Sequence, residues 1–159
     1  HRNKRVKGTQ GRNTKTKHVV LGMVERNGNI KAFKIDDATQ KTILSKVTEH
    51  VVIGTELMTD EYVSYKGLEW LYKHQYIKHK NGEYVNGLVH TNTAEGFFSQ
   101  FKRGVLGIYH FVSPEHLDRY LTEFTFRYNT RDYSEDRRFD LLLSNCAGRI
   151  DYRTLIGTA

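Results

Sequence analysis

Two β-rich runs joined by a turn signal stand near the start of this 159-residue chain. The run 18–26 is β-branched and almost continuously apolar, whereas 30–35 alternates apolar with polar residues. Asn27-Gly28 lies between them and favours a tight two-residue turn. Together the three segments predict a β-hairpin as the first ordered unit of the fold.

Helical spacing dominates the rest of the sequence. One further strand is expected over 55–59, ending on Asp60-Glu61, with extended pieces over 76–85 around Asn81-Gly82. Helices are expected over about 43–51, capped by Asp36, Asp37 or Thr39, over 64–72, over 93–105, from Ser113-Pro114-Glu115 to Tyr128, and over 135–146, where Phe139, Leu142 and Leu143 would be buried. The length suits one domain, and the order of elements predicts an α/β or α+β class with one sheet.

The positive charge of the chain is concentrated at one end. Of its 25 Lys and Arg residues, seven lie in the first 20 positions, which leaves 18 to balance the 18 Asp and Glu residues. The seven are Arg2, Lys4, Arg5, Lys7, Arg12, Lys15 and Lys17. Residues 1–17 are therefore interpreted as a basic flexible arm that favours a polyanion such as nucleic acid, on a neutral body over 18–147 followed by a tail over 148–159.

Composition also excludes several classes of protein. The sequence contains no apolar run long enough for a membrane span, and a single cysteine, Cys146, rules out a disulfide framework and a multi-cysteine zinc site. No signal-peptide pattern is present, so a cytoplasmic, nucleoid-associated location in a reducing compartment is expected. Because the chain begins with His1, it is expected to be part of a longer polypeptide.

Three polar features are candidates for chemistry. Asp60 lies at the C-terminal end of a short strand, where open α/β sheets place their active sites. A polar cluster over 90–95 contains Asn92 and Glu95 at the start of a helix. Lys102-Arg103 lies on that same helix, and the interval of seven positions from Glu95 to Lys102, two helical turns, puts both on one face.

Such a set of side chains is typical of phosphodiester chemistry. Carboxylates on a strand end and a facing helix can hold Mg²⁺ or Mn²⁺, which prefer oxygen ligands. A metal pair about 3.5 to 4 Å apart can activate a water or a 3′-hydroxyl and stabilise the leaving oxygen. A cation two turns along the helix would meet the phosphate backbone, so the substrate would be DNA or RNA.

Each feature also has a purely structural explanation. Asp60-Glu61 can be a capped strand-to-helix turn, and Glu95 to Lys102 an exposed helix face. His90 and Asn92 can satisfy the backbone before the helix. The aromatic residues are expected in the core, with base stacking by Trp70 or Tyr72 as the functional alternative.

Four blocks of sequence, in order, resemble the bacterial insertion-sequence transposases of the DDE superfamily. The closest group is ISXO2-like, with a signature of Asp, Asp, Asn or Glu, then Lys. The blocks are Thr59-Asp60-Glu61-Tyr62, then HTNTAEGFFSQFKRG over 90–104, YHFVS over 109–113 and YLTEFTFRYN over 120–129. Four matching blocks in family order are much harder to obtain by chance than one.

The resemblance implies a ribonuclease H-like fold, a mixed sheet flanked by helices, and DNA transposition by strand cleavage and strand transfer with Mg²⁺ or Mn²⁺, expected as two ions. Asp60 then looks like the second catalytic aspartate, and Asn92 or Glu95 like the third catalytic residue. Glu95 is favoured as the charged ligand, because a neutral amide oxygen binds magnesium less strongly. Lys102 looks like the family lysine that contacts DNA, and Arg103 is expected beside it.

One departure from the family pattern concerns the first catalytic aspartate. In the ribonuclease H-like fold it lies on a first strand that precedes the hairpin, yet no acid occurs before Glu25. That strand is central in the sheet, so its loss would leave the neighbouring strand unpaired. The chain therefore looks N-terminally truncated, and we expect it to be inactive or nearly so by itself.

Three functions remain open on the sequence. The first is a DNA transposase catalytic domain, which in full length is expected to form homo-oligomers on paired DNA ends. The second is a non-catalytic nucleic-acid-binding protein whose arm binds phosphate. The third is another metal-dependent nuclease of the same fold, which cleaves without joining ends.

Overall fold

The computed structural model of the chain describes residues 18–77, 90–146 and 148. The elements, in order, are β1 (Val19–Val24), β2 (Ile30–Ile35), α1 (Gln40–His50), β3 (Glu56–Asp60), two short 3₁₀ turns (Val63–Tyr65 and Leu68–Trp70), β4 (Lys73–Ile77), α2 (Asn92–Gly104), a π-helical turn (Val105–Tyr109), α3 (Leu117–Asn129) and α4 (Glu135–Ser144). None of the described helices combines the length and apolar character that a membrane span requires.

The predicted hairpin is confirmed, with its turn displaced by one residue. β1 and β2 pair antiparallel from Val19 with Ile35 to Val24 with Ile30. The amide of Gly28 donates to the carbonyl of Glu25 at 3.0 Å, so Arg26 and Asn27 occupy the centre of the turn. Asn27 adopts a left-handed φ of 55°, which asparagine tolerates better than most residues.

Helix α1 covers one face of the hairpin. Its N-cap is Thr39, one of the three residues expected there, and its buried Ile43 and Val47 join Leu21 of β1 and Ile35 of β2 in one core. The helix is fixed further at its C-terminal end, where the ring of His50 stacks on Phe33 of β2 at 4.4 Å.

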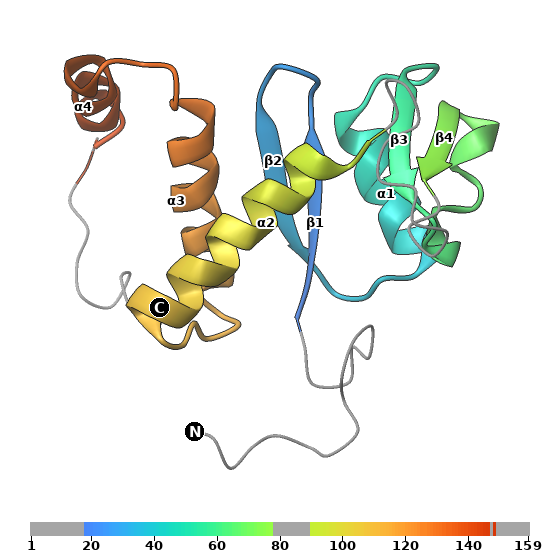
Figure 1. The fold of residues 1–159 in the computed structure, drawn as a ribbon. Coiled ribbons are helices and arrows are strands. Elements are labelled where there is room, and N and C mark those ends of the chain that lie inside the picture. The colour runs from blue at the N-terminus through green and yellow to red at the C-terminus, as the bar shows by residue number, and fades with distance from the viewer. Residues whose placement is uncertain (1–17, 78–89, 147, 149–159) are drawn as a thin grey trace, which may run out of the picture.

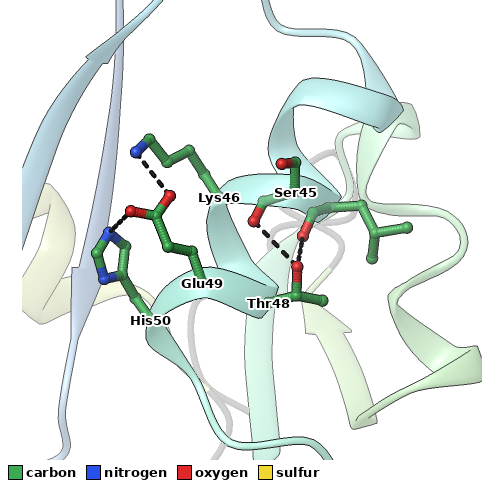
Figure 2. A network of polar contacts seen from close by, with 6 residues as sticks. Ser45, Lys46, Thr48, Glu49 and His50 are labelled. Carbon is green, nitrogen blue, oxygen red and sulfur yellow. Dashed lines mark hydrogen bonds and ion pairs between the residues drawn. The ribbon is translucent and has the colours of Figure 1, made fainter.

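The exposed side of α1 carries a small polar network (Figure 2). Lys46 Nζ lies 2.8 Å from Glu49 Oε2, and His50 Nε2 lies 3.5 Å from the other oxygen of the same carboxylate. The hydrogen bond from Lys46 holds the pKa of Glu49 below its ordinary value. Because Lys46 also lies 5.2 Å from the ring of Phe33, this network serves to hold α1 on β2.

The described strands form two separate pairs, where the sequence predicted one sheet. β3 and β4 are parallel, from Glu56 with Lys73 to Asp60 with Ile77, and they are not hydrogen-bonded to β1 and β2. In Figure 1 the order across the molecule is β2, β1, β3, β4, with β1 on the side of the hairpin nearer to β3. Leu57 of β3 nevertheless packs against the same core as α1, so the two pairs belong to one body.

Helices α2 and α3 cover the opposite face of the hairpin. Val20 and Ala32, which alternate with the residues facing α1, pack against Phe101 of α2 and Leu121 of α3. α2 crosses β1 at Gly22, where a Cβ would lie only 2.7 Å from the ring of Phe98. The hairpin is therefore the middle of three layers, with α1 on one side and α2 and α3 on the other (Figure 1).

The outer edge of β2 is closed by side chains of α3. The amide of Asn129 bonds both backbone groups of Ile30, accepting from its N–H at 2.8 Å and donating to its carbonyl at 3.0 Å. Asp118 accepts a bond from the backbone N–H of Lys34 at 3.2 Å. These bonds replace the strand partner that β2 lacks on this edge.

Three expected elements differ from the observed ones. The helix expected over 64–72 is two 3₁₀ turns separated by Gly67, whose φ of 95° ends any helix there. α3 begins at Leu117, because 113–116 form a separate turn in which His116 N donates to Ser113 O. In α4 no residue is buried, and Phe139, expected in the core, is 60% exposed. Of the extended pieces expected over 76–85, residues 78–85 lie outside the described residues.

Candidate active site

Asp60 ends β3, as expected, and its carboxylate is oriented by the backbone that follows. Oδ1 accepts a hydrogen bond from the N–H of Tyr62 at 3.1 Å, which closes a turn of the Asx type. The side chain is half-buried. The capping role proposed as the structural alternative is thus present.

Residues packed around Asp60 fix the end of its strand. The hydroxyl of Thr59 donates to the carbonyl of Asp60 at 2.8 Å and lies 2.9 Å from Nε2 of His74 on β4. Burial lowers the pKa of His74, a shift opposed by the carboxylate of Glu69. Burial, with a smaller contribution from the charge of Asp60, raises the pKa of Tyr65 to about 12. Tyr65 therefore stays a neutral neighbour of Asp60 at physiological pH.

The first turn of α2 carries the other two candidate ligands. Asn92 is the first residue of the helix, and both Asn92 and Glu95 are exposed. The hydroxyl of Thr91 donates to Glu95 Oε1 at 2.9 Å, which holds this carboxylate near the helix N-terminus. A negative charge is favourable there because it complements the helix dipole.

Arg26 joins the two halves of the candidate site. From the hairpin turn, its guanidinium contacts the sulfur of Met58 on β3 and Nε2 of His90, in the segment leading to α2. Met58 lies two residues before Asp60, and His90 two residues before Asn92. A single side chain thus holds the end of β3 and the start of α2 together. Sequence reasoning missed Arg26, because in the sequence it is one more polar residue in a turn.

The candidate DNA contacts lie in two regions. Lys102 is exposed on α2, seven residues and hence about 10 Å of helix rise beyond Glu95. Arg103 follows it and lines a hollow against α3. The seven arm residues Arg2, Lys4, Arg5, Lys7, Arg12, Lys15 and Lys17 lie outside the described residues.

The two candidates for base stacking behave differently. Tyr72 is 5% exposed and its hydroxyl donates to the carbonyl of Val51 at 3.0 Å, so it is a core residue and the stacking alternative is wrong for it. Trp70 is 84% exposed, beside it on the second 3₁₀ turn.

The donor atoms suit a hard divalent cation but form an incomplete set. Asp60 and Glu95 offer carboxylate oxygens and Asn92 offers an amide oxygen, the ligand types that Mg²⁺ and Mn²⁺ prefer. In the ranges 18–77 and 90–146, no group of three or more His, Cys, Asp or Glu side chains lies close enough to hold a metal ion. A complete carboxylate cage would need a further acid.

Comparison with known families shows which family the chain belongs to. The family model of the ISXO2-like transposase domain matches residues 1–129. The chain belongs to this transposase family. The resemblance inferred from the four motifs is thereby confirmed. No curated protein and no solved structure matches the chain.

The ISXO2-like transposase match contains every candidate site residue. It includes the basic arm, β3 with Asp60, and α2 with Asn92, Glu95 and Lys102. It ends at Asn129, which is also the last residue of α3. Helix α4 thus lies beyond the part of the chain that resembles other transposases.

Proposed function

We infer that this chain is most of a DNA transposase catalytic domain, which cleaves phosphodiester bonds and transfers strands with the help of divalent cations. The observation that carries this proposal is the meeting of β3 and α2 through Arg26, within the transposase match. It brings the segment ending in Asp60 to the segment opening with Asn92 and Glu95. Carboxylates that share divalent cations are the common basis of metal-assisted phosphoryl transfer.

In this proposal Asp60 and Glu95 hold Mg²⁺, with Asn92 as the alternative third ligand. Bound as a pair, the ions would supply a nucleophile and stabilise the leaving oxygen. Glu95 remains the stronger candidate because its full negative charge binds a hard cation better than a neutral amide does. Its bond from Thr91 orients the carboxylate.

We propose a ribonuclease H-like fold for the completed domain. Two observations support it. The hairpin and the parallel pair are not hydrogen-bonded to each other, and β1 and β3 are the strands that face across the gap between the pairs (Figure 1). A further strand between them would give one mixed sheet and would bring the first catalytic aspartate next to Asp60.

DNA is the proposed substrate, bound through Lys102 and the basic arm. The side chain of Lys102 has no hydrogen-bond or ion-pair partner within the described part of the chain, and its position along α2 suits a phosphate beside the reacting one. Arg103 would assist it. Transposon ends and target DNA would both be held in this way, which would place the protein at the nucleoid.

A strand-transfer assay tests the proposal. The 159-residue chain, alone and joined to its native upstream segment, is incubated with labelled transposon-end DNA, a target plasmid and Mg²⁺. We expect joined products only with the upstream segment, and at least a hundredfold loss in Asp60→Ala and Glu95→Ala. Glu56→Gln, at the opposite end of β3, is the control and should retain activity. Full activity in Asp60→Ala would refute the proposal.

A second candidate function is non-catalytic nucleic-acid binding. It is favoured by one observation, the bond from Tyr62 N to Asp60 Oδ1, which gives Asp60 a structural role. This function predicts binding that is indifferent to Mg²⁺ and to Asp60→Ala, and no strand cleavage. Cleavage without joining in the same assay would instead identify a metal-dependent nuclease.

A further inference from the structure

Helix α4 presents an apolar face that nothing in the described chain covers. Phe139, Leu142 and Leu143 are 60%, 49% and 53% exposed, and no residue of α4 is buried. Asp136, Phe139 and Leu143 follow one another at spacings of three and four residues, so they share one face, with Asp140 at its edge. The uncovered face is therefore apolar with an acidic border.

A hollow of about 260 Å³ lies on the other side of α3, between the end of α2 and the π-helical turn. Its lining combines apolar and aromatic residues with basic and polar ones: Gly104, Ile108, Tyr109 and Phe124 with Gln100, Arg103 and Arg127. Ile108 is 71% exposed there. The volume is below the range of small-molecule pockets and suits one or two side chains.

The charges of the two surfaces are complementary. Asp136 and Asp140 on α4, and Arg103 on the hollow, have no ion-pair partner among the residues that the structure describes. Arg127 pairs with Glu123 at 2.7 Å and keeps 61% of its side chain exposed. A helix with an apolar face and an acidic border thus complements a hollow lined by apolar and basic side chains on the same chain.

The connection between α3 and α4 keeps the helix away from its own hollow. Thr130 is buried, with its hydroxyl donating to the carbonyl of Phe126 at 2.8 Å. Arg131 donates to the carbonyl of Tyr128 at 3.0 Å, and its guanidinium lies 4.4 Å from the Tyr128 ring. Figure 1 shows the result, with α4 standing apart at the far end of α3.

We propose that α4 of one protomer docks in the hollow of a second copy, with Phe139 against Ile108 and Phe124, and Asp136 and Asp140 facing Arg103. Because each copy carries one helix and one hollow, a twofold axis satisfies both contacts at once and closes the assembly as a dimer. The inference does not depend on the catalytic proposal, because the dimer is tested by measuring the mass of the protein in the absence of DNA and metal.

Sedimentation equilibrium of the whole chain tests the dimer. The monomer mass is 18.6 kDa, and we expect twice that value at micromolar concentration. Phe139→Asp should raise the dimer dissociation constant at least about thirtyfold, as for a central aromatic contact. Trp70→Asp, at another fully exposed aromatic residue, should leave it unchanged. A monomer at all concentrations, or a dimer unaffected by Phe139→Asp, overturns the proposal.

Charge reversal gives a test that does not depend on the apolar contact. Arg103→Glu alone should weaken the dimer, and Arg103→Glu combined with Asp136→Arg and Asp140→Arg should restore it. Circular dichroism checks that each variant is folded. If Arg103→Glu weakens DNA binding but leaves the dimer intact, the hollow belongs to the DNA surface and the proposal is wrong.

Discussion

The carboxylate of Asp60 is positioned before any ligand reaches it. The bond from Tyr62 N selects its rotamer, and Tyr65 lies close enough for the two charges to interact. A side chain fixed in this way loses little entropy when a cation binds, which favours a functional site. The structural role of Asp60 is therefore compatible with the catalytic role proposed for it.

The proximity of Tyr65 to Asp60 predicts a measurable change in titration. Asp60→Asn should lower the pKa of Tyr65 from about 12, while burial, the larger cause, should keep it above the ordinary value of 10. The measurement is spectrophotometric titration near 295 nm of the wild type and of Asp60→Asn, each with and without Tyr65→Phe. Subtracting the curve of the Tyr65→Phe protein isolates the titration of Tyr65. An unchanged Tyr65 pKa in Asp60→Asn would show that the carboxylate does not face the ring.

The same pKa shift predicts how stability depends on pH. Because the folded-state pKa of Tyr65 is raised, folded protein keeps a proton that unfolded protein releases. The contribution of Tyr65 to the free energy of unfolding is complete below pH 10. It is lost as the pH rises through 12, by up to roughly 2 to 3 kcal/mol. Urea unfolding between pH 9 and 11.5 should show a steeper fall for the wild type than for Tyr65→Phe; parallel curves would contradict the assignment.

Arg26 offers a test of how the site is held together. Arg26→Ala removes the contacts with Met58 and His90, so the start of α2 should open more often. We expect faster amide hydrogen exchange over 92–95, unchanged exchange over 100–104, and a loss of about 0.5 to 1.5 kcal/mol in stability. Arg103→Ala is the matched control. Equal amide exchange over 92–95 in both variants would show that Arg26 does not stabilise the start of α2.

At the residue scale, the sequence predicted the positions of residues that lie in motifs. It did not predict a residue whose contacts depend on the three-dimensional fold. Asp60, Asn92 and Glu95 lie in blocks whose order resembles a family, so their places at a strand end and a helix start could be expected. Arg26 acts across 32 and 64 residues of sequence, and its direction depends on a turn displaced by one position. No local pattern carries that information.

At the scale of elements, periodicity found the hairpin, α1, β3 and α2 because each has an apolar face of the right period. It failed over 64–72, where Gly67 in the left-handed region separates two short turns. It also expected α4 to be buried, because an apolar stripe predicts a covered face but not which molecule covers it.

The crossing of α2 and α3 predicts opposite effects for two glycines of one helix. A Cβ at Gly104 would overlap the ring of Phe124, so Gly104→Ala should destabilise by about 1 to 3 kcal/mol. At Gly96 nothing lies within 4 Å, so Gly96→Ala should stabilise by up to about 1 kcal/mol through helix propensity. Thermal unfolding of both variants checks this, and a neutral Gly104→Ala would mean that the helices do not approach so closely.

At the scale of the whole molecule, strand pairing could not be deduced from local sequence. The hairpin pairs two neighbouring segments, and the turn signal between them predicts that pairing. β3 and β4 pair in parallel, and no turn signal in the sequence predicts this pairing. Which strand edges lie next to each other depends on the helices that pack on the two faces of the strands. The three-layer arrangement follows from two cores, one under α1 and one under α2 and α3.

The charge asymmetry of the chain predicts a specific salt dependence. Seven basic residues in the arm should contribute about −6 to the slope of log binding constant against log salt on duplex DNA. Fluorescence anisotropy between 50 and 200 mM salt, with and without residues 1–17, measures this. Removal of 149–159, which holds two arginines and one aspartate, should change the slope by about 1. An unchanged slope without the arm would place DNA binding elsewhere.

The central claim is that Asp60 and Glu95 bind one divalent cation together. Manganese titration followed by paramagnetic broadening of backbone amide resonances tests it directly, because broadening detects even millimolar binding. We predict selective broadening around 59–62 and 91–95, lost in both Asp60→Asn and Glu95→Gln and kept in Glu56→Gln. Broadening that persists in Asp60→Asn, or that appears only at other acids, would contradict the account.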